Sequence, residues 1–221
     1  MKAVLVLRPE PGASATVAKA RERGLDAIAV PLFEIEPVGW SAPEPSRLDG
    51  LLLTSANAVR SAGEQLRELR TLPAYAVGEA TADAARDAGF DIAAIGDGGI
   101  DRLLDAIDAD LKLLHLCGED RRAPAAARQQ IEPVVVYRAK PIHDPDLSTA
   151  ANSVALIHSP RAGGRFAELV DDRASVAIGA ISQAAADAVG LGWAAVEVAQ
   201  EPNDEALLAL AAMLCNKPGA E

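Results

Sequence analysis

The chain has 221 residues, of which half are hydrophobic and only 3% aromatic, and its formal net charge at pH 7 is −11. This length allows one large domain or two small ones, with a core built from Ala, Val, Leu and Ile. The negative charge argues against a nucleic-acid partner, because contacts from Lys and Arg to phosphates dominate that kind of binding. It does not exclude a small anionic ligand, for which local hydrogen-bond donors matter more than net charge.

The sequence also argues against a membrane segment, an exported protein and a metal site. The first apolar run, residues 3–7, is cut off by Arg8 and Pro9, so we interpret it as a β-strand and not as a signal peptide. No stretch approaches the roughly 18 apolar residues that a membrane helix requires. Cys117 and Cys215 are far apart and the three histidines are scattered, which predicts neither a disulfide framework nor a metal centre. We therefore expect a soluble cytoplasmic protein with free thiols.

Short apolar segments alternate with helical segments along the whole chain. Two examples of the predicted helices are "SANAVRSAGEQLREL" (55–69) and "DEALLALAAML" (204–214). The predicted strands are residues 3–7, 27–30, 50–54, 74–77, 92–95, 112–116, 133–137, 154–158, 176–179 and 195–199. This alternation indicates βαβ units and parallel sheets with helices on both faces. The number of strands is large for one compact sheet, so we predict two α/β domains.

An internal repeat supports two domains. "LLLTSANAVRSAGEQL" (51–66) resembles "ALIHSPRAGGRFAELV" (155–170), and "FEIEP" (33–37) resembles "VYRAKP" (136–141). Gly78 and Gly179 match at nearly the same spacing. We expect two extended segments to cross between the domains and to pair with each other. The resulting domains are a discontinuous one, residues 1–32 and 142–221, and an inserted one, residues 39–132, with residues 33–38 and 133–141 as the connecting strands.

Small, polar and basic residues gather where the predicted strands end and helices begin. Ligands of open α/β sheets bind at this edge, because helix N-termini carry unpaired N–H groups and a partial positive charge. The candidate anion-binding residues are Arg8, Ser55, Asn57, Gly78, Thr81, Ser159, Arg161, Gly179 and Ser182. Helix capping explains Ser55, Ser159 and Thr81 equally well, and the two glycines also suit simple strand-to-helix turns. Arginines near strand ends or the connecting segments, at positions 8, 60, 121, 122, 138 and 161, would attract a polyanion to that side.

Tyr137 lies in the second connecting segment, directly before Arg138. Its phenol either packs as an ordinary core side chain or donates a proton to a departing oxygen. The histidines suggest no catalytic arrangement, because His115 and His158 end apolar strands and His143 lies in a proline-rich turn.

With these residues in place, the chain resembles the uroporphyrinogen-III synthase family over nearly its whole length. The matching segments are "LLLTSANAV", "YAVGEATADAARDAGF", "VVVYRA", "IHSPRAGGRF", "AIGAISQAAADAVG" and "VAQEPNDEALLALA". The resemblance implies two flavodoxin-like α/β domains with parallel sheets, joined by a two-stranded antiparallel ladder, and an active site in the cleft between them. It also implies a cofactor-free lyase of haem biosynthesis. Such an enzyme closes hydroxymethylbilane, a linear tetrapyrrole with eight carboxylates, to uroporphyrinogen III with ring D inverted.

Carried over residue by residue, the resemblance makes Tyr137 the proposed proton donor to the leaving hydroxyl and Thr81 a further catalytic residue. Ser182 stands where a threonine is commoner in the family. Asn57 replaces an arginine, although Arg161 occupies the matching place in the other repeat.

Other hypotheses remain open at this point. The same features suit a two-lobed protein that binds an anionic small molecule without transforming it. A response-regulator type of signalling module would need an acidic pocket at strand ends, and Glu119 and Asp120 are too few acids for one. A transient contact with hydroxymethylbilane synthase, the preceding enzyme, is left open, and nothing requires more than a monomer.

Overall fold

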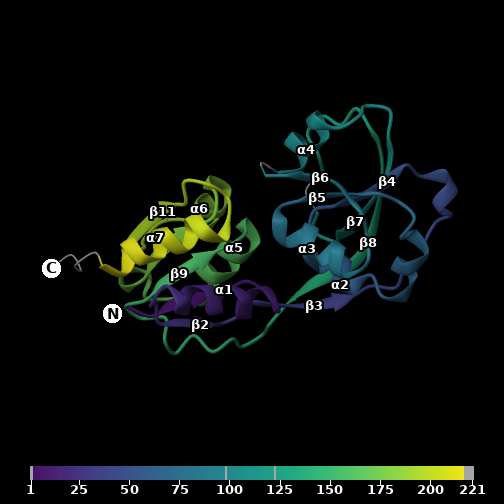
Figure 1. Cartoon of the computed structure of the whole chain (residues 1–221). Helices are drawn as coiled ribbons and strands as arrows, with labels where there is room; N and C mark the ends of the chain where they lie inside the picture. The colour runs from purple at the N-terminus through teal and green to yellow at the C-terminus, as the bar shows by residue number, and fades with distance from the viewer. Residues whose placement is uncertain (1, 98, 122, 217–221) are drawn as a thin grey trace. The chain divides into compact units, whose positions relative to one another are not determined.

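The computed structural model describes residues 2–97, 99–121 and 123–216 (Figure 1). Arg122, one of the basic residues considered above, lies outside these residues. The chain forms two compact units: unit 1 comprises Met1–Glu34 and Pro141–Glu221, and unit 2 comprises Ile35–Lys140. Both boundaries fall inside or at the end of a segment that the sequence predicts to be a connecting strand. Among the described helices, none is long and apolar enough to cross a membrane.

Unit 1 contains a parallel sheet with the strand order β11-β10-β9-β1-β2. Its strands are β1 (Val4–Val6), β2 (Ala27–Ala29), β9 (Val154–Ile157), β10 (Ala177–Ala180) and β11 (Ala195–Val198). Counted along the chain within this unit, the order is 2-1-3-4-5, which is the flavodoxin-like order. Unit 1 therefore has the predicted fold.

Helices cover both faces of the unit 1 sheet. They are α1 (Gly12–Glu22), α5 (Pro160–Leu169), α6 (Gln183–Val189) and α7 (Asp204–Asn216), with a short 3₁₀ turn η3 (Arg173–Ser175). Val4 and Val6 belong to the buried cluster that includes the apolar residues of α1 and α7. Leu5 lies between them and points to the opposite face, because successive strand residues alternate, and it is also fully buried. Helices α5 and α6 pack against each other and against this sheet (Figure 1).

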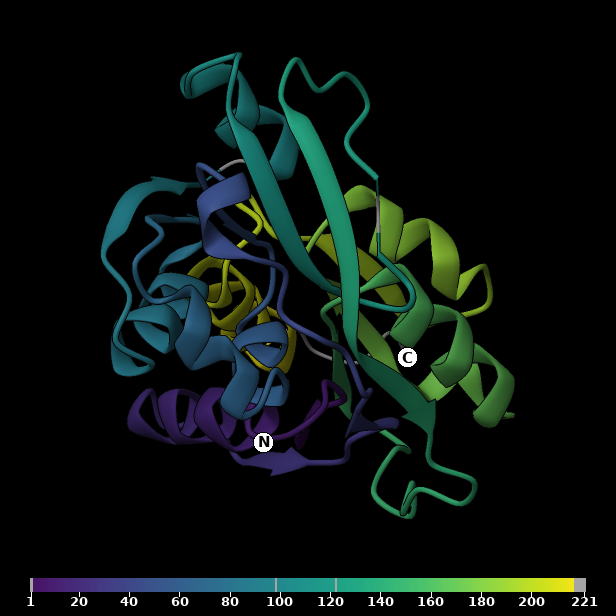
Figure 2. The same cartoon turned by 90° about the vertical axis from the view of Figure 1, so that its right-hand side faces the viewer.

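The sheet of unit 2 has the strand order β3-β8-β7-β4-β5-β6. Its strands are β3 (Phe33–Pro37), β4 (Gly50–Leu53), β5 (Ala74–Val77), β6 (Ile92–Gly96), β7 (Lys112–Gly118) and β8 (Gln130–Pro141). The strands from β8 to β6 are parallel, and the long strand β8 runs beside β7 (Figure 2). Counted along the chain, these parallel strands follow the order 3-2-1-4-5. Unit 2 therefore keeps the doubly wound plan with a strand order different from that of unit 1.

The helices of unit 2 are shorter than the sequence suggests. They are α2 (Ala56–Ser61), α3 (Glu79–Asp87) and α4 (Ile100–Ala106), with 3₁₀ turns η1 (Pro45–Arg47) and η2 (Glu64–Leu69). The predicted continuous helix after β4 divides into α2 and η2 at Gly63, whose φ of 69° is left-handed and breaks the helical path. Leu51 and Leu53 pack with residues of α2 and α3, whereas Leu52 packs with α4 on the other face.

The connecting strands β3 and β8 form the predicted antiparallel ladder. The N–H of Val38 donates to the carbonyl of Val136 at 2.9 Å, and the N–H of Ile142 donates to the carbonyl of Leu32 at 2.9 Å. The residue numbers rise along one strand as they fall along the other, which makes the pair antiparallel. Glu36 on β3 accepts from Lys140 Nζ at 3.1 Å and Arg138 Nε at 2.9 Å, and these bonds lower the pKa of Glu36.

Candidate active site

In unit 2, the side chain of Tyr137 reaches across one strand to the end of the next. Tyr137 on β8 is paired with Gly118 at the end of β7, and β7 lies between β8 and β4. A Cβ on Gly118 would stand 2.7 Å from Cζ of Tyr137 and 2.9 Å from its hydroxyl oxygen, so the ring occupies the space above this glycine. The side chain of Ser55, which follows β4, lies near enough to the phenol to lower its pKa. The carboxyl ends of three neighbouring strands therefore contribute to one group of residues.

The phenol of Tyr137 is half-buried and protonated at neutral pH. Burial raises its pKa above the ordinary value of 10.0, and the nearby side chain of Ser55 acts in the opposite direction. A protonated phenol in this position can donate a hydrogen bond or a proton to an oxygen that leaves a substrate.

Next to this group, Thr54 and His115 form a buried polar pair. Oγ1 of Thr54 lies 2.9 Å from Nε2 of His115, which is 2% exposed. Burial lowers the pKa of His115 from 6.5 to about 4, and the charge of Arg121 adds to the effect. His115 is therefore neutral at physiological pH, and the pair fixes the backbone that leads into Ser55.

Helix α2 begins at Ser55, and helix α3 begins at Gly78. Ser55 caps α2, because its Oγ accepts the backbone N–H of Asn57 at 3.2 Å. Gly78 caps α3 with φ 79°, a backbone conformation that favours glycine. A Cβ built there has no atom within 4 Å, so the backbone conformation, and not lack of space, is the reason for glycine. The capping alternative for Thr81 is wrong: this residue lies inside the first turn of α3, 5% exposed, and its N–H donates to the carbonyl of Gly78 at 3.1 Å.

In unit 1, Ser159 and Ser182 stand at the predicted helix N-termini. Oγ of Ser159 accepts the N–H of Ala162 at 3.2 Å, and Oγ of Ser182 accepts the N–H of Ala185 at 3.4 Å. Both serines are therefore N-caps, like Ser55 in unit 2.

The expectation that Gly179 ends its strand is wrong. Gly179 lies inside β10, between β9 and β11, and the helix begins only after Ser182. A Cβ on Gly179 would stand 3.1 Å from a methyl group of Leu156 and 3.6 Å from one of Leu207, so this glycine allows close packing in the core. It does not form a strand-to-helix turn like that of Gly78.

The two candidate arginines of unit 1 are both engaged with other side chains. The guanidinium of Arg161, in the first turn of α5, lies 4.6 Å from the centre of the Phe33 ring, a cation–π contact. Arg8 forms an ion pair at 3.1 Å with Asp204, the first residue of α7. Sequence reasoning did not select Asp204, although an acid at the start of the helix in "EPNDEALL" is a recognisable signal.

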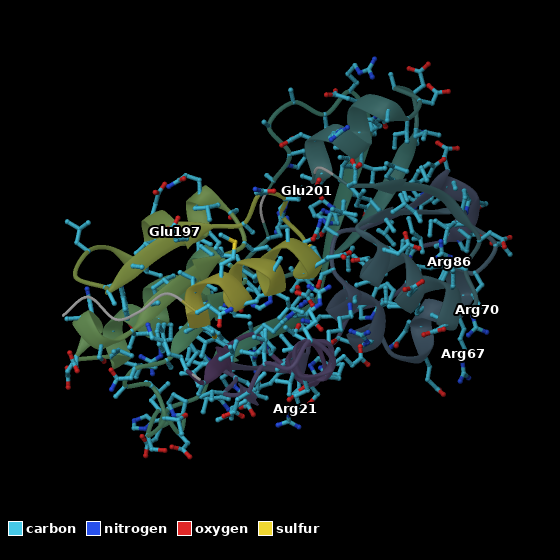
Figure 3. All side chains as sticks on the ribbon, turned by 60° about the vertical axis from the view of Figure 1, so that its left-hand side comes forward. Arg21, Arg67, Arg70, Arg86, Glu197 and Glu201 are labelled. Atoms are coloured by element: carbon cyan, nitrogen blue, oxygen red, sulfur yellow. The ribbon has the colours of Figure 1, made fainter. Side chains whose placement is uncertain are left out.

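Several arginines of the helix surfaces are paired with acids nearby. Arg86 on α3 contacts Glu79 at 2.8 Å and Asp83 at 2.7 Å, and Arg67 on η2 contacts Glu64 at 3.5 Å. Figure 3 labels both arginines. These pairs belong to the exposed helical layer of unit 2. Within the part of the chain that the structure describes, no group of three or more His, Cys, Asp or Glu side chains is placed to hold a metal ion.

The two α/β sheets with polar side chains at their carboxyl edges, and the antiparallel pair of connecting strands, define a two-unit α/β protein of the class that binds ligands at the ends of its strands. The chain belongs to the uroporphyrinogen-III synthase family: the sequence model described as uroporphyrinogen-III synthase HemD matches residues 14–209. This is a family of cyclising lyases in tetrapyrrole and haem biosynthesis.

Comparisons with individual proteins agree with this family. The chain is 34% identical over 90 residues to uroporphyrinogen-III synthase of Chlorobaculum parvum, a stretch that spans 37% of this chain and 37% of that protein. Uroporphyrinogen-III synthetase of Helicobacter pylori has a similar structure, with a TM-score of 0.68 and 20% identity over 97% of this chain and all of that one. A mutant uroporphyrinogen III synthase of Thermus thermophilus gives a TM-score of 0.53 and 19% identity over 98% of this chain and all of that one. The structural likenesses support the same fold.

Proposed function

We propose that this chain converts hydroxymethylbilane into uroporphyrinogen III, with loss of water and inversion of ring D, and that Tyr137 is its proton donor. The observation that carries the proposal is the position of the Tyr137 phenol: protonated, half-buried and held between Gly118 and Ser55 at the carboxyl edge of the unit 2 sheet. The family relationship supplies the reaction.

In the proposed reaction, Tyr137 donates a proton as the hydroxyl group of ring A departs as water. The resulting azafulvenium-type cation is attacked by the substituted carbon of ring D, which gives a spiro intermediate. Cleavage of one bond in this intermediate and closure in the other orientation produce the inverted macrocycle, and loss of a ring proton restores the pyrrole. The sequence is a dehydration and a ring closure without net oxidation, so it requires no redox cofactor.

The substrate carries eight carboxylates, and we propose that strand-end residues in each unit bind them. The donors are the guanidinium groups of Arg8 and Arg161, the side chain of Asn57, the hydroxyls of Ser55, Thr81, Ser159 and Ser182, and backbone N–H groups near Gly78. Hydroxymethylbilane closes spontaneously to the uninverted type I isomer. The protein therefore acts mainly by holding the chain in the geometry that leads to the inverted product.

The experiment that tests the proposal is isomer analysis of the product. Purified protein is mixed with freshly prepared hydroxymethylbilane, the products are oxidised to uroporphyrins, and the type I and type III isomers are separated by chromatography. We expect type III as the main product, formed faster than the spontaneous reaction. Type I alone, at the spontaneous rate, would reject the enzyme and would leave the non-catalytic anion-binding protein as the better hypothesis.

We further propose that the reaction takes place in the cytoplasm and that the substrate passes from hydroxymethylbilane synthase during a transient contact. The instability of hydroxymethylbilane favours such a transfer, because time in free solution converts it to the type I isomer. In a coupled assay, a catalytically inactive variant of this chain, added in excess, should raise the type I fraction by competing for the contact. An unchanged isomer ratio would argue for transfer through solution.

A further inference from the structure

In unit 1, polar side chains from four elements meet around the carboxylate of Asp204. Oδ1 of Asp204 accepts from Nη1 of Arg8 at 3.1 Å and from Nε2 of His158 at 3.1 Å. Oδ2 accepts from the hydroxyl of Thr16 at 2.7 Å, and this hydroxyl also lies 3.4 Å from Nη1 of Arg8. Arg8 follows β1, His158 follows β9, Thr16 lies in α1 and Asp204 begins α7. The group therefore stands at the carboxyl edge of the sheet, where ligands of this fold class bind.

The charges in this group are well defined. Burial alone would raise the pKa of Asp204, but the bonds from His158 and Thr16 and the charge of Arg8 hold it well below its ordinary value. Burial holds the pKa of His158 below its ordinary value, so His158 is neutral and its Nε2–H donates to the carboxylate. Asp204 thus accepts from three donors, of which only Arg8 is charged, so the group as a whole carries no net charge.

The guanidinium of Arg8 is held through one nitrogen and keeps its other donors. Both of its hydrogen bonds involve Nη1, and within residues 2–97, 99–121 and 123–216 no hydrogen bond or ion pair involves Nε or Nη2. The side chain is 35% exposed. A Cβ on Gly12 would stand 2.7 Å from Nε and 3.2 Å from Nη2, so the lack of a side chain at residue 12 lets the guanidinium lie in this place without a collision.

We propose that Asp204 is the positioning residue of Arg8, that Gly12 gives the guanidinium room to take this orientation, and that its donors Nε and Nη2 bind one carboxylate of the substrate. A guanidinium presents two parallel N–H groups to a carboxylate, and fixing its orientation in advance reduces the conformational entropy lost on binding. This inference rests on the proposed function, because it needs the multi-carboxylate substrate. The competing explanation is that Asp204 only attaches α7 to the sheet.

A double-mutant cycle separates the two explanations. Asp204→Asn removes the charge that orients Arg8, and Gly12→Ala places a methyl group beside Nε without touching Asp204. Each substitution is made in the wild-type protein and in the Arg8→Gln variant. KM and kcat are measured with hydroxymethylbilane as the substrate. The thermal unfolding temperature of each protein is measured separately. We expect each single substitution to raise KM about five- to tenfold, with kcat little changed, because one charge-assisted contact is weakened. In the Arg8→Gln background neither substitution should raise KM further.

Glu205→Gln is the matched control, because Glu205 is the next residue of α7 and its side chain is 85% exposed. Its Oε1 lies 3.6 Å from Nη2 of Arg23, a weak surface ion pair. If the KM of Asp204→Asn lies within about twofold of that of this control, and its unfolding temperature is lower, then Asp204 only attaches α7 to the sheet and does not position Arg8. If Asp204→Asn does not fold, an unchanged KM for Gly12→Ala, which displaces the guanidinium, would contradict the carboxylate site. A wild-type protein that forms no type III isomer would reject the proposed function and, with it, this inference.

Discussion

The ring of Tyr137 lies over the α-carbon of Gly118, at the one place where β7 carries no side chain between β8 and Ser55. A Cβ at residue 118 would be 2.7 Å from Cζ of the ring, closer than a carbon–carbon contact permits. The glycine therefore lets the phenol cross β7 toward Ser55, whose side chain lowers the pKa of the phenol. This contact joins the second connecting strand to the start of helix α2, and most of the predictions below depend on it.

Gly118→Ala should displace the phenol and lower activity far more than stability. The methyl group collides with the outer part of a side chain that can turn away, so we expect a stability loss of about 1 kcal/mol. The displaced proton donor should lower kcat roughly 100-fold. Steady-state kinetics and denaturant unfolding measure the two effects. The control is Gly164→Ala in α5, where the nearest atom to the new Cβ is 4.0 Å away. Equal kcat values for the two variants would show that the ring position is not important.

Ser55→Ala should change the pKa of Tyr137, whereas removal of a comparable cap elsewhere should not. Ser55, Ser159 and Ser182 each accept one backbone N–H at a helix start, so each substitution by alanine should cost about 1 kcal/mol. Of these three serines, only Ser55 lies near the phenol of Tyr137 and lowers its pKa. Spectroscopic titration of tyrosinate in a Tyr75→Phe background, which leaves Tyr137 as the only tyrosine, should give a higher pKa for Ser55→Ala than for Ser159→Ala. Identical titration curves would show that Ser55 does not influence the phenol.

His115 should make the protein less stable as the pH falls from about 6.5 to about 4. Burial lowers the pKa of His115 from 6.5 to about 4 in the folded protein. In this window the unfolded chain binds a proton that the folded chain does not, so unfolding becomes easier as the pH falls, and below about pH 4 the effect is complete. The expected loss is up to about 3 kcal/mol.

The measurement is the free energy of unfolding at several pH values for the wild type and for His115→Gln, whose amide can still bond Thr54. The difference between the two proteins should change between pH 6.5 and 4, because the other titrating groups are common to both. A difference that is constant over this range would mean that His115 is not held neutral by burial.

The sequence predicts the strands well because each is a short apolar run bounded by turn residues. Every predicted strand from residues 3–7 to residues 195–199 has a counterpart in the structure, and the two connecting segments pair as expected. The helix after β4 was less predictable. Its alanine-rich pattern gives no sign that Gly63 takes a left-handed conformation and divides it.

The candidate sites were predictable where a residue acts through local backbone geometry. Ser55, Ser159 and Ser182 lie at the predicted helix starts for that reason. Gly179 was misplaced, because a glycine that packs against Leu156 within a strand looks the same in sequence as a glycine at a turn. Asp204 was missed because its partners Arg8 and Thr16 are distant along the chain, and only the fold brings these side chains together.

The measurement that tests the central claim most directly is the rate and isomer composition of the reaction with Tyr137→Phe, which removes one hydroxyl and keeps the ring. The variant and the wild type are compared with freshly prepared hydroxymethylbilane, and the spontaneous type I product is subtracted. We predict a loss of about 100-fold or more in kcat for type III formation, larger than for Ser55→Ala, Thr81→Ala, Ser159→Ala or Ser182→Ala. A Tyr137→Phe variant that forms the type III isomer at the wild-type rate would contradict the account.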